Sequence, residues 1–429
     1  MEKTLNTQLL SFIGKSVSPF HAIDAIRQEL SGYTALQEGQ AWDLQHGGHY
    51  YVTRNGSAII AFRIPEGDWQ GILMAASHSD SPTFKIRENA AINGPDGYVR
   101  LNVERYGGAI NSTWLDRPLG VAGRVMVRSG SRIESRLVDL GTVTMIPNVA
   151  IHMNRKMNDG YAYDLKTDLV PLWGLEGCTD LIALAAKAAG TAEADLVGHE
   201  LALYAAQPGY QWGTGDEFIS SPRLDDLQCA FATLKGFLSA KAGPGLPLYC
   251  VLDNEEVGSG SKQGANGTFL RDVLERICAT LGRDLAQEAA HSFLLSADNA
   301  HAVHPNHPEY ADSTHRPRMN GGIVVKYSAA QRYTTDAVSR AIFAEICRRA
   351  DVPVQFFANR PDVPGGSTLG NIANSQISLN SVDIGLPQLA MHSACETAGA
   401  LDTGYLVKAS AEFYSSGLTA EADGQLVLH

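Results

Sequence analysis

Apolar, strand-like runs alternate with amphipathic helical patterns over the second half of the chain, and this alternation constrains the fold most. Strands are expected at 246–252, 292–297, 321–327, 353–358 and 378–384. Helices are expected before, between and after them, at 226–240, 267–281, 335–349 and 403–416. This order is typical of an α/β domain, in which helices cover a central sheet.

The first half of the chain adds to this domain and then interrupts it. Residues 18–31 read as a helix with Ser18 as N-cap and Pro19 at its first position. GILMAAS (71–77) reads as a further buried strand. Residues 91–211 carry alternating strand patterns, Gly turns and one helical stretch. We therefore expect a discontinuous α/β domain with a central mixed sheet, formed by residues 1–90 and 212–429, and an inserted, mostly β domain at 91–211.

The charge and the cysteines limit the classes of function. A formal net charge of −12 argues against nucleic acid and anionic membranes as partners. The first residues, MEKTLNTQLLSFIG, do not follow the pattern of a secretory signal, and no run of apolar residues reaches membrane-spanning length. The six scattered cysteines read as free thiols in a reducing compartment. We expect a cytoplasmic protein that acts on a small molecule or a peptide.

Five short segments place His, Asp or Glu at strand ends or helix starts, where open α/β sheets form their sites. They are HSD (78–80), RLDDL (223–227), DNEEVG (253–258), SADNAH (296–301) and MHS (391–393). The most specific is DNEEVG, because three acidic residues directly after a buried strand are costly unless a cation or a reaction uses them.

Each of the other segments also has a purely structural interpretation. His78 and Asp80 fit an ordinary turn with a hydrogen bond, Asp225 and Asp226 fit helix caps, and a lone His392 fits a structural role. The spacing of the histidines in HAVHPNH (301–307) suggests a separate metal site. However, the prolines in and after this stretch break any helix that would align them, which favours a loop.

Read together, the segments supply the ligands and the charge for two divalent cations. The candidate ligands are His78, Asp225, Glu256, Asp298 and His392. Three carboxylates and a bridging hydroxide carry about four negative charges, which two divalent ions balance. Asp80 would accept the proton on the other ring nitrogen of His78, and Glu255 would act as general base.

The same segments closely resemble the M18 family of metalloaminopeptidases, the aspartyl aminopeptidase group. The matching strings are SHSDSPTFK (77–85), SPRLDD (221–226), DNEEVGSGSKQGA (253–265), SADNAHAVHPN (296–306), VKYSAAQRY (325–333), GGSTLG (365–370) and MHSACETAG (391–399). They occur in family order over most of the chain. The resemblance implies a metallopeptidase domain and an inserted dimerisation domain.

The resemblance also implies a role for each site residue. His78 and Asp298 would hold one metal, Glu256 and His392 the other, Asp225 would bridge them, Asp80 would orient His78, and Glu255 would be the base. His152 would reach the active site of a neighbouring subunit and help to bind substrate. Lys326 would lie near the pocket for the first side chain of the substrate. One departure is visible: many members have Asn after the bridging Asp, whereas this chain has Asp226.

The family's activity and assembly are carried over as expectations. The chain would remove the N-terminal residue from short peptides, with a lean to Asp or Glu if Lys326 pairs with the substrate, and to neutral residues such as Leu if Lys326 is only a surface lysine. The two metal ions would be Zn²⁺, although Co²⁺ and Mn²⁺ also suit these ligands. The subunits would form dimers through the inserted domain and then a tetrahedral homododecamer.

Two other functions fit parts of the sequence. A related two-metal carboxypeptidase or deacylase would use the same ligands, and activity on a peptide with a blocked amino terminus would favour it. A catalytically silent metal-binding assembly protein would keep the fold. The presence of every expected ligand together with Glu255 argues against the silent protein, and the chain contains no GxSxG, Walker A or GxGxxG motif.

Overall fold

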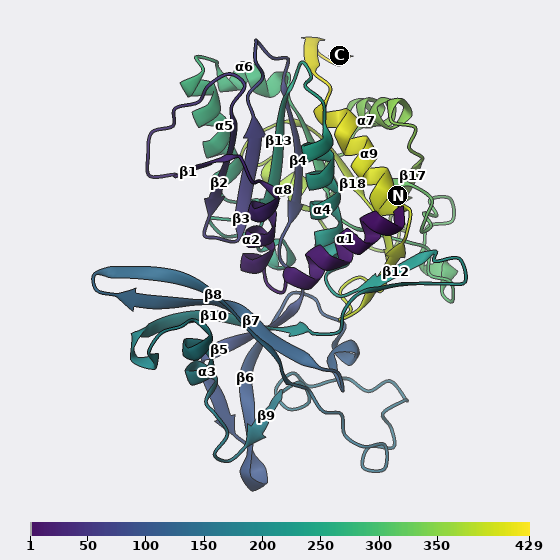
Figure 1. The fold of residues 1–429 in the computed structure, drawn as a ribbon. Helices are drawn as coiled ribbons and strands as arrows, with labels where there is room; N and C mark the ends of the chain where they lie inside the picture. Colours follow the sequence, from purple (N-terminus) through teal and green to yellow (C-terminus); the bar gives the residue numbers. More distant parts are fainter. Residues whose placement is uncertain (1) are drawn as a thin grey trace.

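The computed structural model describes residues 2–429 and contains an α/β part and a β-rich part (Figure 1). A nine-stranded sheet forms the centre of the α/β part, in the order β1-β2-β3-β13-β4-β14-β18-β16-β17. Its strands are β1 (Thr34–Leu36), β2 (His49–Arg54), β3 (Ala58–Arg63), β4 (Ile72–His78), β13 (Leu246–Leu252), β14 (Phe293–Ala297), β16 (Ile323–Tyr327), β17 (Val354–Ala358) and β18 (Asn380–Gly385).

This central sheet is mixed, as the sequence predicts. β13, β4, β14 and β18 are parallel neighbours in its middle. β3 runs antiparallel to β13, and β16 runs antiparallel to β18. The carboxyl ends of the four middle strands therefore share one edge of the sheet, which is where α/β proteins build their sites.

Helices cover both faces of the central sheet. One core lies between the sheet and α1 (Glu2–Lys15), α2 (Pro19–Glu29), α4 (Leu224–Ser239), α7 (Ala337–Arg349) and α9 (Asp402–Tyr414). The other core lies under α5 (Phe269–Thr280), α6 (Leu285–Ala290) and α8 (Leu369–Ala373). Residues of one strand alternate between the two cores: Leu73 and Ala75 face the first, Met74 and Ala76 the second. This alternation is what a strand buried on both faces requires.

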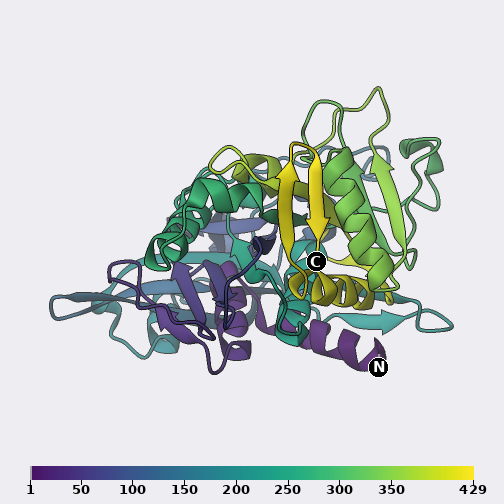
Figure 2. The same ribbon diagram turned by 90° about the horizontal axis from the view of Figure 1, so that it is seen from above.

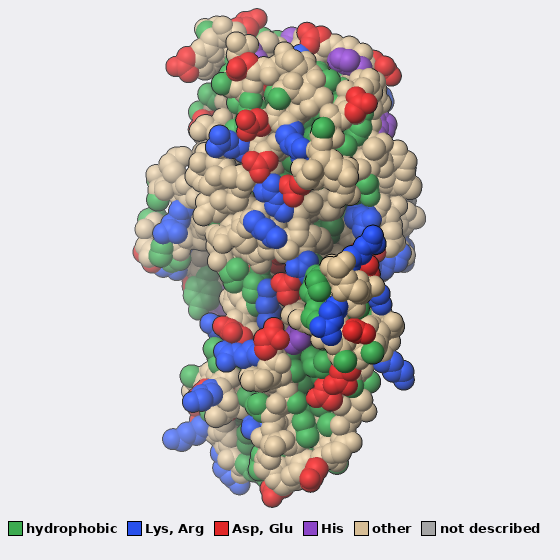
Figure 3. Space-filling model, turned by 90° about the vertical axis from the view of Figure 1, so that its left-hand side faces the viewer, with side chains coloured by type: hydrophobic (Ala, Val, Ile, Leu, Met, Phe, Trp, Pro, Cys, Tyr) green, Lys and Arg blue, Asp and Glu red, His purple; other side chains and the backbone are tan. Residues whose placement is uncertain are grey.

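The β-rich part lies below the α/β part in Figure 1 and consists of a six-stranded antiparallel sheet. Its order is β8-β7-β10-β5-β6-β9, and α3 (Leu181–Ala188) packs beside it. The strands are β5 (Thr83–Asn93), β6 (Tyr98–Tyr106), β7 (Leu119–Ser129), β8 (Arg132–Thr144), β9 (Leu172–Leu175) and β10 (Leu196–Ala205). In the space-filling view, hydrophobic side chains are prominent on this lower part of the molecule (Figure 3). Large apolar side chains that its strands expose include Ile133, Leu137 and Val197.

Two smaller sheets complete the molecule. A five-stranded sheet contains β11 (Tyr210–Trp212), β12 (Phe218–Ser221), β20 (Glu396–Gly399), β19 (Pro387–Leu389) and β15 (Ala300–His301), in that order. A C-terminal hairpin of β21 (Leu418–Ala422) and β22 (Gln425–Leu428) stands beside α7 in the view from above (Figure 2). Arg349 of α7 donates a hydrogen bond to the carbonyl of Leu428 at 3.1 Å, which ties the hairpin to the helix.

The predicted strands and helices of the second half are confirmed, with shifts of a few residues at their ends. The helix predicted at 18–31 is also confirmed as α2, and the Ser18 hydroxyl accepts a hydrogen bond from the His21 amide at 3.4 Å. Three further strands, β1, β2 and β3, extend the central sheet beside β13 and were not expected from the sequence. No helix among the described residues is both long and apolar enough to cross a membrane.

Candidate metal centre

Three candidate ligands lie at the shared edge of the central sheet because neighbouring parallel strands end there. β4 ends at His78, Asp298 follows the end of β14, and Glu256 lies four residues after the end of β13. The order β13-β4-β14 places His78 between the two carboxylates. All three side chains are largely buried, with exposed fractions of 1% for His78, 12% for Asp298 and 3% for Glu256.

The other two candidate ligands reach the same edge from the five-stranded sheet. Asp225 follows β12 at the start of α4, where it and Asp226 have non-helical dihedral angles and are joined by a cis peptide bond. His392 lies in the connection between β19 and β20. The buried Glu396 of β20 fixes both segments, because its carboxylate accepts hydrogen bonds from the Asp225 amide (3.0 Å) and the His392 amide (2.8 Å).

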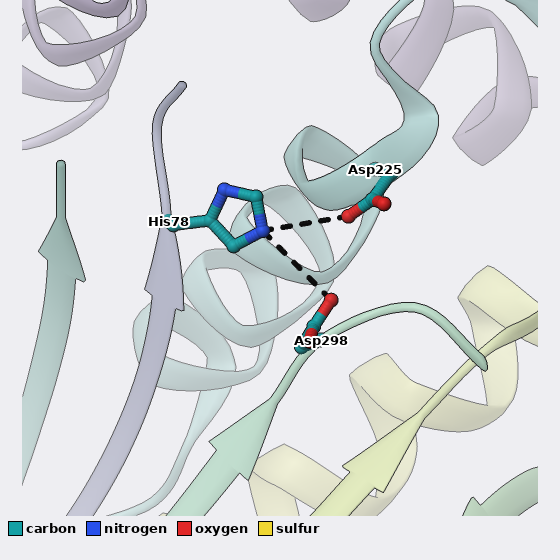
Figure 4. A group of neighbouring side chains, drawn as sticks. All are labelled: His78, Asp225 and Asp298. Atoms are coloured by element: carbon teal, nitrogen blue, oxygen red, sulfur yellow. Dashed lines mark ion pairs between the residues drawn. The ribbon is translucent and has the colours of Figure 1, made fainter. Parts of the chain in front are cut away.

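The five side chains form two groups that share Asp225. In the first group, His78 Nε2 lies 3.4 Å from Asp225 Oδ1 and 3.8 Å from Asp298 Oδ1 (Figure 4). In the second group, His392 Nε2 lies 3.5 Å from Asp225 Oδ2 and 3.3 Å from Glu256 Oε2. Within each group, the potential ligand atoms lie within 4.8 Å of one another. Asp225 thus presents one carboxylate oxygen to each group.

Both histidines are oriented as metal ligands need to be. His78 Nδ1 lies 3.0 Å from the carbonyl oxygen of Asp80, and His392 Nδ1 lies 3.2 Å from the carbonyl oxygen of Gly108. A carbonyl only accepts hydrogen bonds, so each ring carries its proton on Nδ1. In the neutral ring this leaves the lone pair of Nε2 directed at the carboxylates.

The charges of the two groups fit divalent cations. Asp225 Oδ1 and Glu256 Oε1 are buried and have no hydrogen-bond partner among the described residues, and such orphaned anionic atoms are costly. Burial, and then the neighbouring Asp225, raise the pKa of Glu256 well above its usual value. Burial alone would lower the pKa of His78, but the neighbouring carboxylates of Asp225, Asp298 and Asp80 raise it well above 6.5. Without a metal, the cluster therefore takes up protons, and two divalent cations would supply the missing positive charge.

Asp80 lies behind the first group and holds the segment that follows β13. Its carboxylate accepts hydrogen bonds from the amides of Glu255 (3.1 Å) and Glu256 (3.2 Å). Asp80 Oδ1 also lies 3.4 Å from His78 Nδ1. Asp80 therefore contacts His78 of the first group and Glu256 of the second group. It also holds Glu255, which does not belong to either group.

A cavity of about 370 Å³ opens on both groups. Its lining includes Glu255, and burial raises the pKa of this carboxyl to about 8. Lys326 also lines the cavity, with its Nζ atom 3.4 Å from Asp298 Oδ2. Although burial opposes it, Asp298 raises the pKa of Lys326, so the amine is positively charged. The volume suits one or two amino-acid residues of a substrate.

Other candidate residues lie away from the two groups. His152 is exposed in the connection between β8 and β9, and it does not line the cavity of its own chain. His304 and His307 lie in a loop, as the sequence analysis favours, with their ring centres 5.3 Å apart. Asp226 is fully buried and accepts a hydrogen bond from the His78 amide at 3.1 Å. Burial raises the pKa of Asp226 well above its usual value, and in its neutral form the carboxyl can replace the amide of an Asn.

Three residues of the site had no role in the sequence analysis: Glu396, Tyr106 and Asn254. Glu396 and Asn254 lie inside the strings MHSACETAG and DNEEVGSGSKQGA, which could have drawn attention to them. Tyr106 donates a hydrogen bond to Asp80 at 2.6 Å from the end of β6 in the other sheet. Tyr106 lies opposite Thr83, which comes three residues after Asp80, in the antiparallel pair of β5 and β6, so the contact depends on the register of that pair.

Comparison with known proteins gives one consistent family. The model of the family described as "Aminopeptidase I zinc metalloprotease (M18)" matches residues 12–414. The chain is 42% identical over 423 residues to the Clostridium acetobutylicum protein named "Probable M18 family aminopeptidase 2", covering 95% of this chain and 98% of that protein.

Solved structures give the same result for the fold. The chain is similar to a protein in the structure titled "Cryo-EM structure of the Ape4 and Nbr1 complex", with a TM-score of 0.92, 34% identity, and coverage of 96% of this chain and 86% of that chain. It is also similar to the mApe1 dodecamer of S. cerevisiae, with a TM-score of 0.85, 30% identity, and coverage of 96% of each chain.

Proposed function

The chain belongs to the M18 family of metalloaminopeptidases, and we propose that it holds two divalent ions to release the first residue of short peptides. His78, Asp225 and Asp298 would hold one ion, and Asp225, Glu256 and His392 the other. The observation that carries this proposal is the position of Asp225, whose two oxygens face different histidines at 3.4 and 3.5 Å. The family is one of zinc metalloproteases, so we propose Zn²⁺ for both sites.

When bound, such a pair of ions polarises the scissile carbonyl and lowers the pKa of a water molecule. Glu255 accepts a proton from the attacking water and later gives it to the leaving amine. The backbone amides of Glu255 and Glu256 donate hydrogen bonds to Asp80. These bonds fix the position of the base, Glu255, relative to the ligand, Glu256. The buried acidic groups of the cavity favour a substrate with a free, positively charged amino terminus, which restricts release to one residue at a time.

We propose that Lys326 favours substrates whose first residue is Asp or Glu. Lys326 is only 4% exposed and lines the cavity, and its amine lies beside the ring of Tyr333. Asp298 pairs with it at 3.4 Å, but that carboxylate also belongs to the first metal group. If Asp298 ligated a cation, Lys326 would have more of its charge available for a substrate carboxylate.

We further propose that the protein is a homo-oligomer assembled through the β-rich sheet, in the form of a tetrahedral dodecamer, with His152 reaching the site of a neighbouring subunit. The dodecameric assembly of mApe1 and the exposed apolar residues of β8 and β10 support this proposal. The free cysteines, including four buried ones, fit a reducing compartment such as the cytoplasm.

An aminopeptidase assay tests the activity directly. The metal-free chain is reconstituted with Zn²⁺, Co²⁺ or Mn²⁺ and offered Asp-, Glu- and Leu-p-nitroanilide, each with a free or an acetylated amino group. We expect turnover only of the free amines and only after a metal is added. Hydrolysis of a peptide with an acetylated amino terminus and a free carboxyl terminus would support a deacylase or a carboxypeptidase instead.

The same substrates test Lys326. Lys326→Ala is expected to lower kcat/KM for the Asp and Glu compounds by at least about tenfold relative to the Leu compound, because a charge-assisted hydrogen bond is lost. The ratio between substrates is the internal control, since a general loss of metal or stability lowers all three rates together. If the ratio of kcat/KM between the acidic and Leu compounds did not change, Lys326 would not determine the substrate preference.

A further inference from the structure

Three consecutive residues of the β-rich sheet contact the metal centre from outside the α/β part. They lie where β6 ends: Tyr106, Gly107 and Gly108. Tyr106 contacts Asp80, Gly107 packs against Glu256, and Gly108 contacts His392. We call this tripeptide the β6 arm.

The hydroxyl of Tyr106 has a defined hydrogen-bond direction. The side-chain amide of Asn254 donates to Tyr106 Oη at 2.9 Å, so the hydroxyl proton is free to point to Asp80 Oδ2, 2.6 Å away. The orientation of the Asn254 amide is itself fixed, because its oxygen accepts hydrogen bonds from Ser261 (2.7 Å) and Gln263 (2.9 Å). Tyr106 is only 8% exposed, and Lys85 lies over its ring at 4.1 Å.

Tyr106 contributes one of the contacts around the buried carboxylate of Asp80, and three other groups contribute the rest. Asp80 is 1% exposed. Its carboxylate accepts hydrogen bonds from the amides of Glu255 and Glu256 and faces His78 Nδ1. A carboxylate with donors on both oxygens is held in one orientation. Loss of the hydroxyl would leave Asp80 Oδ2 with one long hydrogen bond and loosen the groups that Asp80 positions.

The glycines act on the second metal group. Gly107 has φ +72, and a Cβ atom there would lie 3.2 Å from Glu256 Cβ and 3.3 Å from Pro82 Cα. The backbone therefore approaches Glu256 more closely than a side chain would permit. The carbonyl of Gly108 accepts the Nδ1 proton of His392 at 3.2 Å, which turns His392 Nε2 to Asp225 and Glu256.

We propose that the β6 arm is a positioning element of the metal centre, so that the packing of the β-rich sheet against the α/β part helps to set metal affinity. Tyr106 acts on the first group through Asp80 and His78, and the two glycines act on the second group through Glu256 and His392. This inference rests on the proposed function, since it assumes that both groups bind cations.

Titration of the metal-free chain with Co²⁺, followed by visible absorption and calorimetry, tests the inference. The wild-type chain is expected to bind two equivalents. Tyr106→Phe keeps the ring over which Lys85 lies and removes only the hydroxyl. We expect one of the two equivalents to bind roughly 10-fold more weakly, in line with other residues that orient metal ligands. Gly107→Ala is expected to weaken the other equivalent.

Tyr204→Phe is the matched control. Tyr204 also lies in the β-rich sheet and donates a hydrogen bond to an aspartate, Asp139, at 2.8 Å. It contacts neither Asp80 nor any of the five candidate ligands. We expect this variant to lose some stability but to bind both equivalents with wild-type affinity and spectra.

A double-mutant cycle shows whether Tyr106 acts through Asp80. If it does, Tyr106→Phe has little further effect on metal affinity in an Asp80→Asn background. Two equivalents bound by Tyr106→Phe with wild-type affinities and spectra would overturn the inference and leave the proposed function intact. Fewer than two equivalents bound by the wild-type chain would instead contradict the proposed function.

Discussion

Asp225 is the residue on which the two halves of the candidate site depend. Its carboxylate is 3% exposed, and each of its oxygens faces a different histidine. Its amide is held by Glu396, which also holds the amide of His392. Glu255 and Glu256 both line the cavity, and only Glu256 belongs to a metal group. On the proposed mechanism, Glu255 is the base and Glu256 is a ligand.

Substitution of the two glutamates tests that separation. Glu255→Gln removes the proton acceptor but none of the candidate ligands, so we expect it to bind two metal ions and to lower kcat by roughly 10²–10⁴-fold. Glu256→Gln changes a ligand, so we expect it to lose one equivalent of metal. Metal analysis and steady-state kinetics of both variants give the result. If Glu255→Gln lost metal and Glu256→Gln did not, the roles would be exchanged.

The five candidate ligands named from the sequence lie together in the structure, whereas several of their supporting residues were not expected from the sequence. His78, Glu256 and Asp298 follow predicted strands, and strand ends are recognisable from apolar runs. Asp226, where the family resemblance leads one to expect Asn, is explained only by its burial, which favours the neutral carboxyl. The contact of Tyr106 with Asp80 depends on the register of β5 and β6, which shifts between Ile86 and Ala91, and no local pattern of residues predicts that shift.

At the scale of elements, the close approach of β18 to the end of β14 fixes Asp298. Gly385 ends β18, and an added Cβ atom there would lie 2.0 Å from the carbonyl oxygen of Asp298. Only glycine permits this approach, because the contact is with backbone that cannot move aside without shifting Asp298.

Gly385→Ala is therefore expected to weaken metal binding and to lower the free energy of unfolding by about 1–3 kcal/mol, a usual cost of overpacking. Gly14→Ala is the control, because Gly14 lies in α1 and a Cβ atom there meets no atom within 4 Å. The control should be neutral or stabilising by up to about 1 kcal/mol. Thermal unfolding with and without Zn²⁺ measures both effects. A Gly385→Ala protein with wild-type stability and metal affinity would contradict the assigned contact.

Two of the strands that were not expected, β2 and β3, could have been predicted from the residues of their turn. β2 and β3 form a hairpin whose turn contains Asn55 and Gly56, both with positive φ. An Asn-Gly pair between apolar runs is a strong indicator of a hairpin. The pairing of β3 with β13, about 190 residues later, has no such local signal and follows from the topology of the sheet.

At the scale of the whole molecule, the acidic centre lies inside a chain that already carries a net charge of −12. Both the α/β part and the β6 arm contribute contacts to it. A cation that binds this centre in the folded chain but not in the unfolded chain stabilises the fold by mass action.

We expect Zn²⁺ to raise the Tm and a chelator to lower it. At a free Zn²⁺ concentration of 100 times the Kd, one site contributes about 2.7 kcal/mol, which corresponds to a shift of several degrees. Asp225→Asn should lose most of this shift because both groups share Asp225. Asp423→Asn, an exposed control in the C-terminal hairpin, should keep it. Differential scanning calorimetry makes the comparison, and an equal shift in both variants would mean that zinc binds elsewhere.

The central claim is that two cations lie side by side between the two groups, and anomalous diffraction from crystals grown with Zn²⁺ tests it most directly. We predict two peaks per chain at about 2.0–2.2 Å from their ligands, one bound by His78 and Asp298, the other by Glu256 and His392, with Asp225 contacting both. A single peak, or peaks bound by other residues, would contradict the account.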